Sequence, residues 1–320
     1  LKVLREDVRG WLTEDPRLLL ALVIVVVPHV PDAAGGRLDI IGAIGLAIGL
    51  CAALIAVSKG NDWGWASGTT LGLLAAGIVV LIAWGFYQLR ASDPLVDLRT
   101  TAQPAVLLTN IAAIAIGFGM MAQSVVIPAL LEMPKETGIG LGQTMLAAGL
   151  WMAPGGLMML VFSPVSGILI NKIGPKPTLA IGATVLGVGY LVALFLMNSP
   201  WQLMIAAIIG SSGVGIGYAA MPTLIMGAVP ITEAGAAVGL NGLMRSVGTT
   251  VASAVMALVL TSSTIELGGI AFPDHTAFRW CFMIGALAAF VGAAITLLIP
   301  VRKQAAAAAS TGGAALARQG

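Results

Sequence analysis

Charged residues are scarce in this sequence. Asp, Glu, Lys and Arg make up only 9% of its 320 residues, whereas hydrophobic residues make up 58%. A water-soluble domain carries roughly 25% charged residues, and a soluble core could not bury so large an apolar surface. The shortage of charge therefore excludes a soluble globular domain. The small net charge of +2 gives no reason to expect a nucleic-acid partner.

Cysteine and histidine are also rare, with two residues of each type. Cys51 and Cys281 lie far apart in apolar runs, so they predict neither a disulfide framework nor a metal cluster. The only histidines that could join them as ligands are His29 and His275. We therefore expect no metal site and no cofactor. No Ser/His, Cys/His or carboxylate pair has the spacing that would suggest an enzyme.

What the sequence does contain is long apolar segments. A helix needs about 20 such residues to cross the hydrocarbon layer of a bilayer, and eight segments reach or approach that length. They predict an all-α polytopic membrane protein with spans at 40–57, 67–88, 105–131, 143–170, 178–197, 201–226, 236–261 and 278–300. An earlier apolar run, residues 18–27, is too short to span and predicts only a partial helix before Pro28.

Basic residues divide unevenly between alternate loops, and cytoplasmic loops are the ones enriched in Lys and Arg. This rule predicts a multi-pass protein of the cell (inner) membrane with its C-terminus in the cytoplasm. The side assigned to the cytoplasm holds Arg37, Arg90, Arg99, Lys172, Lys176, Arg302, Lys303 and Arg318, and the outer side holds Lys59, Lys135 and Arg279.

The loop after the fourth predicted span has a distinctive pattern, formed by Gly167, Asn171, Lys172, Gly174 and Lys176. It resembles the loop signature of the major facilitator superfamily, except that the family usually has aspartate at the position of Asn171. The resemblance implies a cytoplasmic latch, in which the basic residues pair with carboxylates or helix C-termini in one conformational state and release them in the other. The charge lost at Asn171 would weaken this latch. Alternatively, Lys172 and Lys176 merely follow the positive-inside rule.

A second resemblance covers residues 221–256, where Met221-Pro222 precedes the run from Glu233 to Gly248. This segment is similar to the eleventh helix and its preceding loop in the 14-span drug:proton antiporter branch of the superfamily. The resemblance implies the following organisation: residues 1–39 as a charged N-terminal segment with a partial sixth helix and a cytoplasmic loop, 40–104 as two linker helices, 105–300 as the C-terminal six-helix bundle, and 301–320 as a disordered cytoplasmic tail.

The same resemblance implies proton-coupled antiport of lipophilic or cationic drugs by a full-length protein of which this chain is a C-terminal portion. Its partners would be the lipid bilayer, a small lipophilic substrate, protons and a missing N-terminal six-helix half. Two alternatives remain open. One is an exporter of another small metabolite with the same fold, and the other is a truncated membrane protein that does not transport.

Polar and soft side chains within the spans are the candidates for a substrate cavity: Asn110, Met121, Gln123, Trp151, Met152, Tyr218, Asn241 and Arg245. Arg245 is the clearest ionisable group inside a span, and it either faces the cavity or snorkels to the interface. No Asp, Glu or His falls in the middle of a span, so we expect the proton-coupling carboxylate to lie outside these eight helices.

Small residues recur four positions apart within the spans, as at Gly213/Gly217, Gly235/Gly239 and Gly248/Ala252. In a bilayer, such spacing lets the backbones of two helices approach closely. Helix packing is therefore the predicted role of these pairs.

Overall fold

The computed structural model describes residues 39–300, so the predictions for residues 1–38 and 301–320 lie outside the described part. Eight helical segments in this part are long and apolar enough to cross a membrane, which confirms the all-helical membrane fold. They are α3 (Ile40–Trp63), α4 (Gly68–Arg90), α6 (Pro104–Glu132), α7 (Met145–Ile173), α8 (Pro175–Phe195), α9 (Pro200–Tyr218) continued by α10 (Ala220–Met226), α11 (Ala234–Ser262) and α12 (His275–Leu298).

Short polar or proline-containing segments start these helices. Thr144 and Asp274 accept backbone N–H groups of the first turns of α7 and α12, which would otherwise lack partners. Pro104, Pro175 and Pro200 begin α6, α8 and α9, because proline fits the first helical position without losing a hydrogen bond. The helix boundaries therefore follow local sequence signals.

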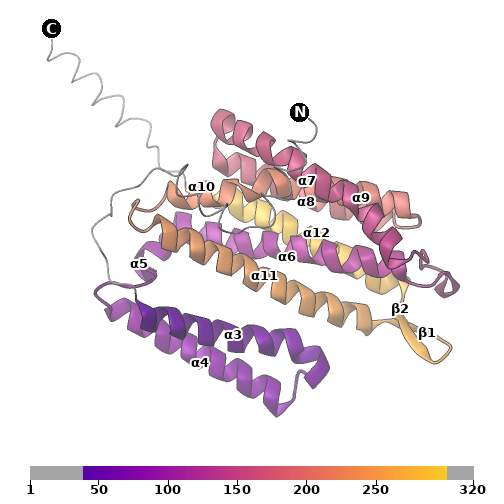
Figure 1. The fold of residues 1–320 in the computed structure, drawn as a ribbon, viewed down its shortest axis with the longest axis horizontal. Coiled ribbons are helices and arrows are strands. Elements are labelled where there is room, and N and C mark those ends of the chain that lie inside the picture. Colours follow the sequence, from indigo (N-terminus) through magenta and orange to yellow (C-terminus); the bar gives the residue numbers. More distant parts are fainter. Residues whose placement is uncertain (1–38, 301–320) are drawn as a thin grey trace, which may run out of the picture. The chain divides into compact units, whose positions relative to one another are not determined.

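Neighbours in space are mostly not neighbours in the chain. α6 packs on α11 and α12, α9 packs on α7 and α8, and α8 packs on α12 (Figure 1). Helices α3 and α4 pack on each other, and α3 also lies along α11. The bundle is thus assembled from contacts between helices that are distant in sequence.

Asp39 fastens α3 and α4 together at one end. Its carboxylate accepts hydrogen bonds from Gly42 N (2.7 Å), Tyr87 Oη (3.1 Å), Gln88 Nε2 (3.0 Å) and Leu95 N (3.3 Å). Burial raises the pKa of Asp39, but these hydrogen bonds lower it by more, so the pKa lies below its ordinary value. One carboxylate therefore joins the start of α3, the end of α4 and the segment that follows.

The α8–α9 contact depends on glycine. A Cβ at Gly182 would lie 2.6 Å from the Cα of Gly217 and 2.7 Å from the carbonyl oxygen of Gly213. This is the close approach predicted for Gly213/Gly217. Gly235 and Gly239 behave differently, because a Cβ at either position would meet no other atom of the described residues within 4 Å. The predicted packing of this second pair is therefore absent from the described residues.

Several elements differ from the predicted spans. The first span continues to Trp63 rather than ending at 57, with Lys59 and Asp62 paired at 2.9 Å in its last turn. The span predicted at 201–226 is divided between α9 and α10 at Ala219. An antiparallel hairpin, β1 (Thr264–Leu267) and β2 (Ile270–Pro273), connects α11 to α12. We call this end of the bundle the hairpin end, and the opposite end, which holds the turn between α7 and α8, the loop-motif end. Two short elements also went unpredicted, α5 (Leu98–Thr101) and the 3-10 helix η1 (Lys135–Thr137).

Candidate functional site

Arg245 lies about three turns into α11 and is the one charged side chain in the central turns of the described spans. Its guanidinium carbon stands 4.5 Å from the centroid of the Tyr218 ring, which terminates α9. A guanidinium over an aromatic face is held by the ring quadrupole, an interaction worth about 0.5–2 kcal/mol depending on desolvation. Arg245 is only partly buried, and Tyr218 is 37% exposed. The pair therefore joins α11 to α9, and part of each side chain stays accessible at the surface of the described bundle.

The position of Arg245 depends on close packing between α6 and α11. A Cβ at Gly117 of α6 would collide with the backbone of Arg245, and a Cβ at Gly248 would lie 2.8 Å from the carbonyl carbon of Ile114. Two glycines on facing helices thus bring the backbones together. For Gly248, this is the role that its spacing predicted.

Asn110 and Asn241 form a second polar pair one turn from Arg245, toward the loop-motif end. Asn241 Nδ2 donates to Asn110 Oδ1 at 2.9 Å and to the carbonyl of Thr109 at 3.4 Å. Both amides are almost fully buried, and Asn110 Nδ2 has no hydrogen-bond partner among the described residues. A buried N–H group without a partner costs roughly 1–3 kcal/mol. This amide is therefore a point where a further polar group would be favourable.

Gln123 connects α6 to α9 instead. Its Nε2 donates to Ser211 Oγ at 3.1 Å and to the carbonyl of Ala207 at 3.4 Å. Nearby on α6, the carbonyl of Gly119 accepts the hydroxyl of Tyr190 from α8. Polar groups of α6 therefore reach three different helices, and they fix the orientation of α6 within the bundle.

The other three predicted cavity residues lie apart from Arg245 or only border the core. Trp151 is on the second turn of α7, and its Nε1 donates to Gln143 Oε1 at 3.2 Å near the hairpin end. Met152 packs against the hydrophobic core, and so does Met120, the neighbour of the half-buried Met121. The predicted set is thus brought together only around Arg245, Tyr218 and the two asparagines.

The residues of the predicted latch lie at the loop-motif end. Lys176 Nζ donates to the carbonyl of Ile299 at 2.7 Å, at the C-terminus of α12, where a helix carries partial negative charge. Gly174 has φ +89°, a left-handed conformation that favours glycine, at the turn from α7 to α8. Asn171 and Lys172 are exposed, with no side-chain hydrogen bond to a described residue, and Gly167 lies within α7 facing open space.

Sequence reasoning missed a row of hydroxyl groups on α11. Ser246, Thr250 and Ser253 follow each other at spacings of four and three residues, and Thr249 lies beside them. Each of these hydroxyls donates to a carbonyl of its own helix, so none depends on another helix for a partner. Their helical spacing next to Arg245 is the signal that could have identified them. They give α11 a mildly polar face.

Metal chemistry has no support in the described residues, because within 39–300 no three His, Cys, Asp or Glu side chains lie close enough together to hold an ion.

Comparison with known proteins identifies the family to which this helical bundle belongs. Residues 112–318 match the Major Facilitator Superfamily, and the chain belongs to this family of membrane transporters.

Three relatives illustrate the similarity. The chain is 26% identical over 230 residues to "Uncharacterized MFS-type transporter YhcA" of Bacillus subtilis (strain 168), covering 71% of this chain and 42% of the relative. It is 25% identical over 253 residues to "Multidrug resistance protein Stp" of Mycobacterium tuberculosis, covering 78% and 46%. It is 32% identical over 165 residues to "Lincomycin resistance protein LmrB" of Bacillus subtilis (strain 168), covering 50% and 33%. The chain thus spans about half the length, or less, of these relatives.

Proposed function

We propose that this chain supplies the C-terminal bundle of a transporter that exports a small lipophilic compound in exchange for protons. The observation that carries the proposal is the partly accessible pair formed by Arg245 of α11 and Tyr218 at the end of α9, within a Major Facilitator bundle. Two of the relatives above are named for resistance to several drugs or to lincomycin, which supports an exported drug-like substrate.

The activity requires a second bundle. α7 and α11 are the least buried helices of the six that follow the linker pair, and on α7 Met145, Leu146 and Leu160 are 79%, 76% and 71% exposed. Gly149 and Gly156 on the same helix would admit a close neighbour, since a Cβ at either meets no described atom within 4 Å. The partial coverage of the relatives supports a partner bundle that packs on these two helices.

Arg245 narrows the class of substrate. Within residues 39–300 the central turns of the spans hold no carboxylate to neutralise Arg245, so its fixed positive charge repels a permanent cation and tolerates a neutral compound. Of the two predicted substrate classes, lipophilic and cationic, the lipophilic one is therefore favoured. An anionic metabolite is the second candidate, because a carboxylate or phosphate could pair with the guanidinium.

Proton coupling needs a group whose pKa lies in a useful range, usually a carboxylate in a buried site. The central turns of the spans within 39–300 contain no Asp, Glu or His. We therefore assign coupling to a carboxylate outside these eight helices. A prediction follows directly: the eight described spans do not move protons by themselves.

The test compares cells that carry the complete gene with its upstream DNA, cells that carry only this chain, and cells with neither. Accumulation is measured for a neutral lipophilic dye, a permanent cation and an organic anion. We expect the complete gene to lower accumulation of the neutral dye, and a protonophore to abolish the effect. Lower accumulation of the anion alone would favour the metabolite exporter, and no effect of the complete gene on any compound would indicate a protein that does not transport.

A further inference from the structure

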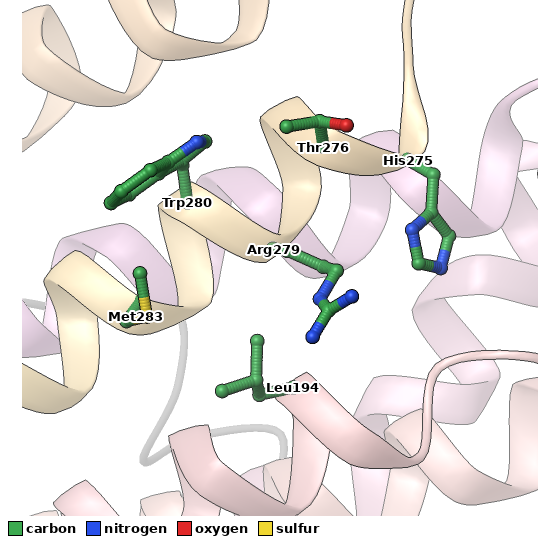
Figure 2. A pocket seen from close by; sticks show the side chains of 6 residues that line it. All are labelled: Leu194, His275, Thr276, Arg279, Trp280 and Met283. Carbon is green, nitrogen blue, oxygen red and sulfur yellow. The ribbon is translucent and has the colours of Figure 1, made fainter.

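A pocket of about 250 Å³ lies at the hairpin end, between the first turns of α12 and the end of α8. Its lining consists of Leu194, His275, Thr276, Arg279, Trp280 and Met283. Figure 2 shows the side chains of His275 and Arg279 pointing to the same side of α12, with Arg279 directed toward Leu194. This pocket is remote from Arg245 along the helices, and the proposed transport site does not use it.

The polar groups of the pocket are basic or neutral. His275 and Arg279 are one helical turn apart, and Thr276 is the remaining polar side chain in the lining. Within residues 39–300, no carboxylate pairs with Arg279, because the one ion pair recorded there is Lys59–Asp62. The adjacent Asp274 is already occupied by Ser263 Oγ and Ala277 N, each at 2.7 Å. The guanidinium therefore has no anionic partner from the described protein.

The pocket is open toward the apolar surface of the bundle. Trp280 is 51% exposed at the start of a span, the position where an indole ring anchors at the membrane interface. Further along α12, Met283, Leu287 and Val291 are exposed at helical spacing, and Phe195 is exposed at the end of α8. The three α12 side chains form a strip that runs from the pocket toward the interior of the bilayer.

We propose that this pocket binds the phosphodiester headgroup of an anionic phospholipid in the leaflet at the hairpin end. Arg279 donates to the phosphate, since its guanidinium binds phosphate oxygens in a fork, and His275 supplies a second donor. One acyl chain then lies along Met283 and Leu287, at the level where lipid tails begin. A free phosphate ion would satisfy the guanidinium but would leave this apolar strip unused, so the lipid is the occupant that fits both parts.

The experiment measures lipid binding to the full chain in detergent by native mass spectrometry. Phosphatidylglycerol is compared with phosphatidylcholine of the same chain length, and inorganic phosphate and glycerol phosphate are added as competitors. We expect the chain to bind phosphatidylglycerol more tightly than phosphatidylcholine. Neither inorganic phosphate nor glycerol phosphate should remove this preference. An equal affinity for the two lipids, or displacement of phosphatidylglycerol by inorganic phosphate at a similar concentration, would overturn the proposal.

Variants locate the site. Arg279→Gln should weaken phosphatidylglycerol binding by about tenfold, the effect of losing a charged hydrogen bond. Leu194→Trp, which fills the pocket and keeps both basic groups, should weaken it similarly. Lys135→Gln removes another exposed cation from the hairpin end and should leave the affinity unchanged. Full affinity in Leu194→Trp, or an equal loss in Lys135→Gln, would mean that general attraction of basic side chains to the lipid surface explains the preference. Neither result depends on whether the protein transports anything.

Discussion

The guanidinium of Arg245 lies over the ring of Tyr218, 4.5 Å from its centroid, and connects the centre of α11 to the end of α9. Tyr218→Leu removes the ring, whereas Tyr218→Phe keeps it. We expect Tyr218→Leu to lower the free energy of unfolding by about 0.5–1 kcal/mol, because the pair is partly exposed, and Tyr218→Phe to have a smaller effect. Unfolding titrations in detergent, combined with Arg245→Ala in a double-mutant cycle, measure the coupling. Additive effects of the two substitutions would show that the residues do not interact.

The glycines of α11 provide a matched pair for testing helix packing. Gly248→Ala places a methyl group against the backbone of Ile114 and should lower the free energy of unfolding by about 1–3 kcal/mol, as overpacking does. Gly239→Ala lies on the same helix with open space around it, and should be neutral or stabilising by up to about 1 kcal/mol through helix propensity. Equal effects of the two substitutions would contradict the close contact between α6 and α11.

The predicted spans agree with the structure where the length of the apolar segment sets the helix ends. They differ from it where local backbone geometry sets them. Lys59 and Asp62 suggest a loop by composition, yet their ion pair accompanies nearly two further turns of α3. The break after Tyr218 does have a signal in the apolar run 201–226, because Pro222 lacks the N–H group that would bond to the carbonyl of Tyr218 four residues earlier. The hairpin did have a signal, since Gly268-Gly269, with φ of +60° and +82°, is a typical two-residue turn.

The candidate site could be predicted only in part, because its residues meet through contacts between helices that are distant in the chain. Arg245 is recognisable as a charge within a span, but its partner Tyr218 comes from the end of another helix. Residue type alone predicts Trp151 to join Arg245 in the cavity, but its side chain donates to Gln143 near the hairpin end. Hydropathy identifies the helices but does not predict which of them are neighbours in space, and this arrangement separates Trp151 from Arg245.

The buried amide pair should be sensitive to loss of one member. Asn241→Ala leaves Asn110 Oδ1 buried without its donor, and we expect the free energy of unfolding to fall by about 1–3 kcal/mol. Replacing both residues with leucine removes the unsatisfied groups together and should recover part of that loss. Thermal unfolding of Asn241→Ala and of the double leucine variant measures the difference. A double variant no more stable than Asn241→Ala would show that the amides are not mainly partners of each other.

Asp39 predicts a dependence of stability on pH. Its pKa in the folded protein is below that of the unfolded chain, so the ionised carboxylate stabilises the fold at pH values above the unfolded pKa. That contribution is lost as the pH falls through the folded pKa. Asp39→Asn should therefore reduce stability at neutral pH and flatten the acid limb of a stability–pH curve. Asp93→Asn, which alters a nearby exposed carboxylate, is the control. An unchanged acid limb in Asp39→Asn would contradict this account.

The central claim is that Arg245 belongs to the working site of an exporter, and it is tested by the initial rate at which energised cells with the complete gene extrude a neutral lipophilic dye. We expect Arg245→Ala to lower this rate by about tenfold or more, as for loss of one hydrogen bond from the guanidinium to a polar atom of the compound, while Lys135→Gln retains it at equal protein levels. Arg245→Lys, which keeps the charge without the planar fork, should fall between them. An Arg245→Ala protein that extrudes the dye as fast as the unaltered protein would contradict the claim.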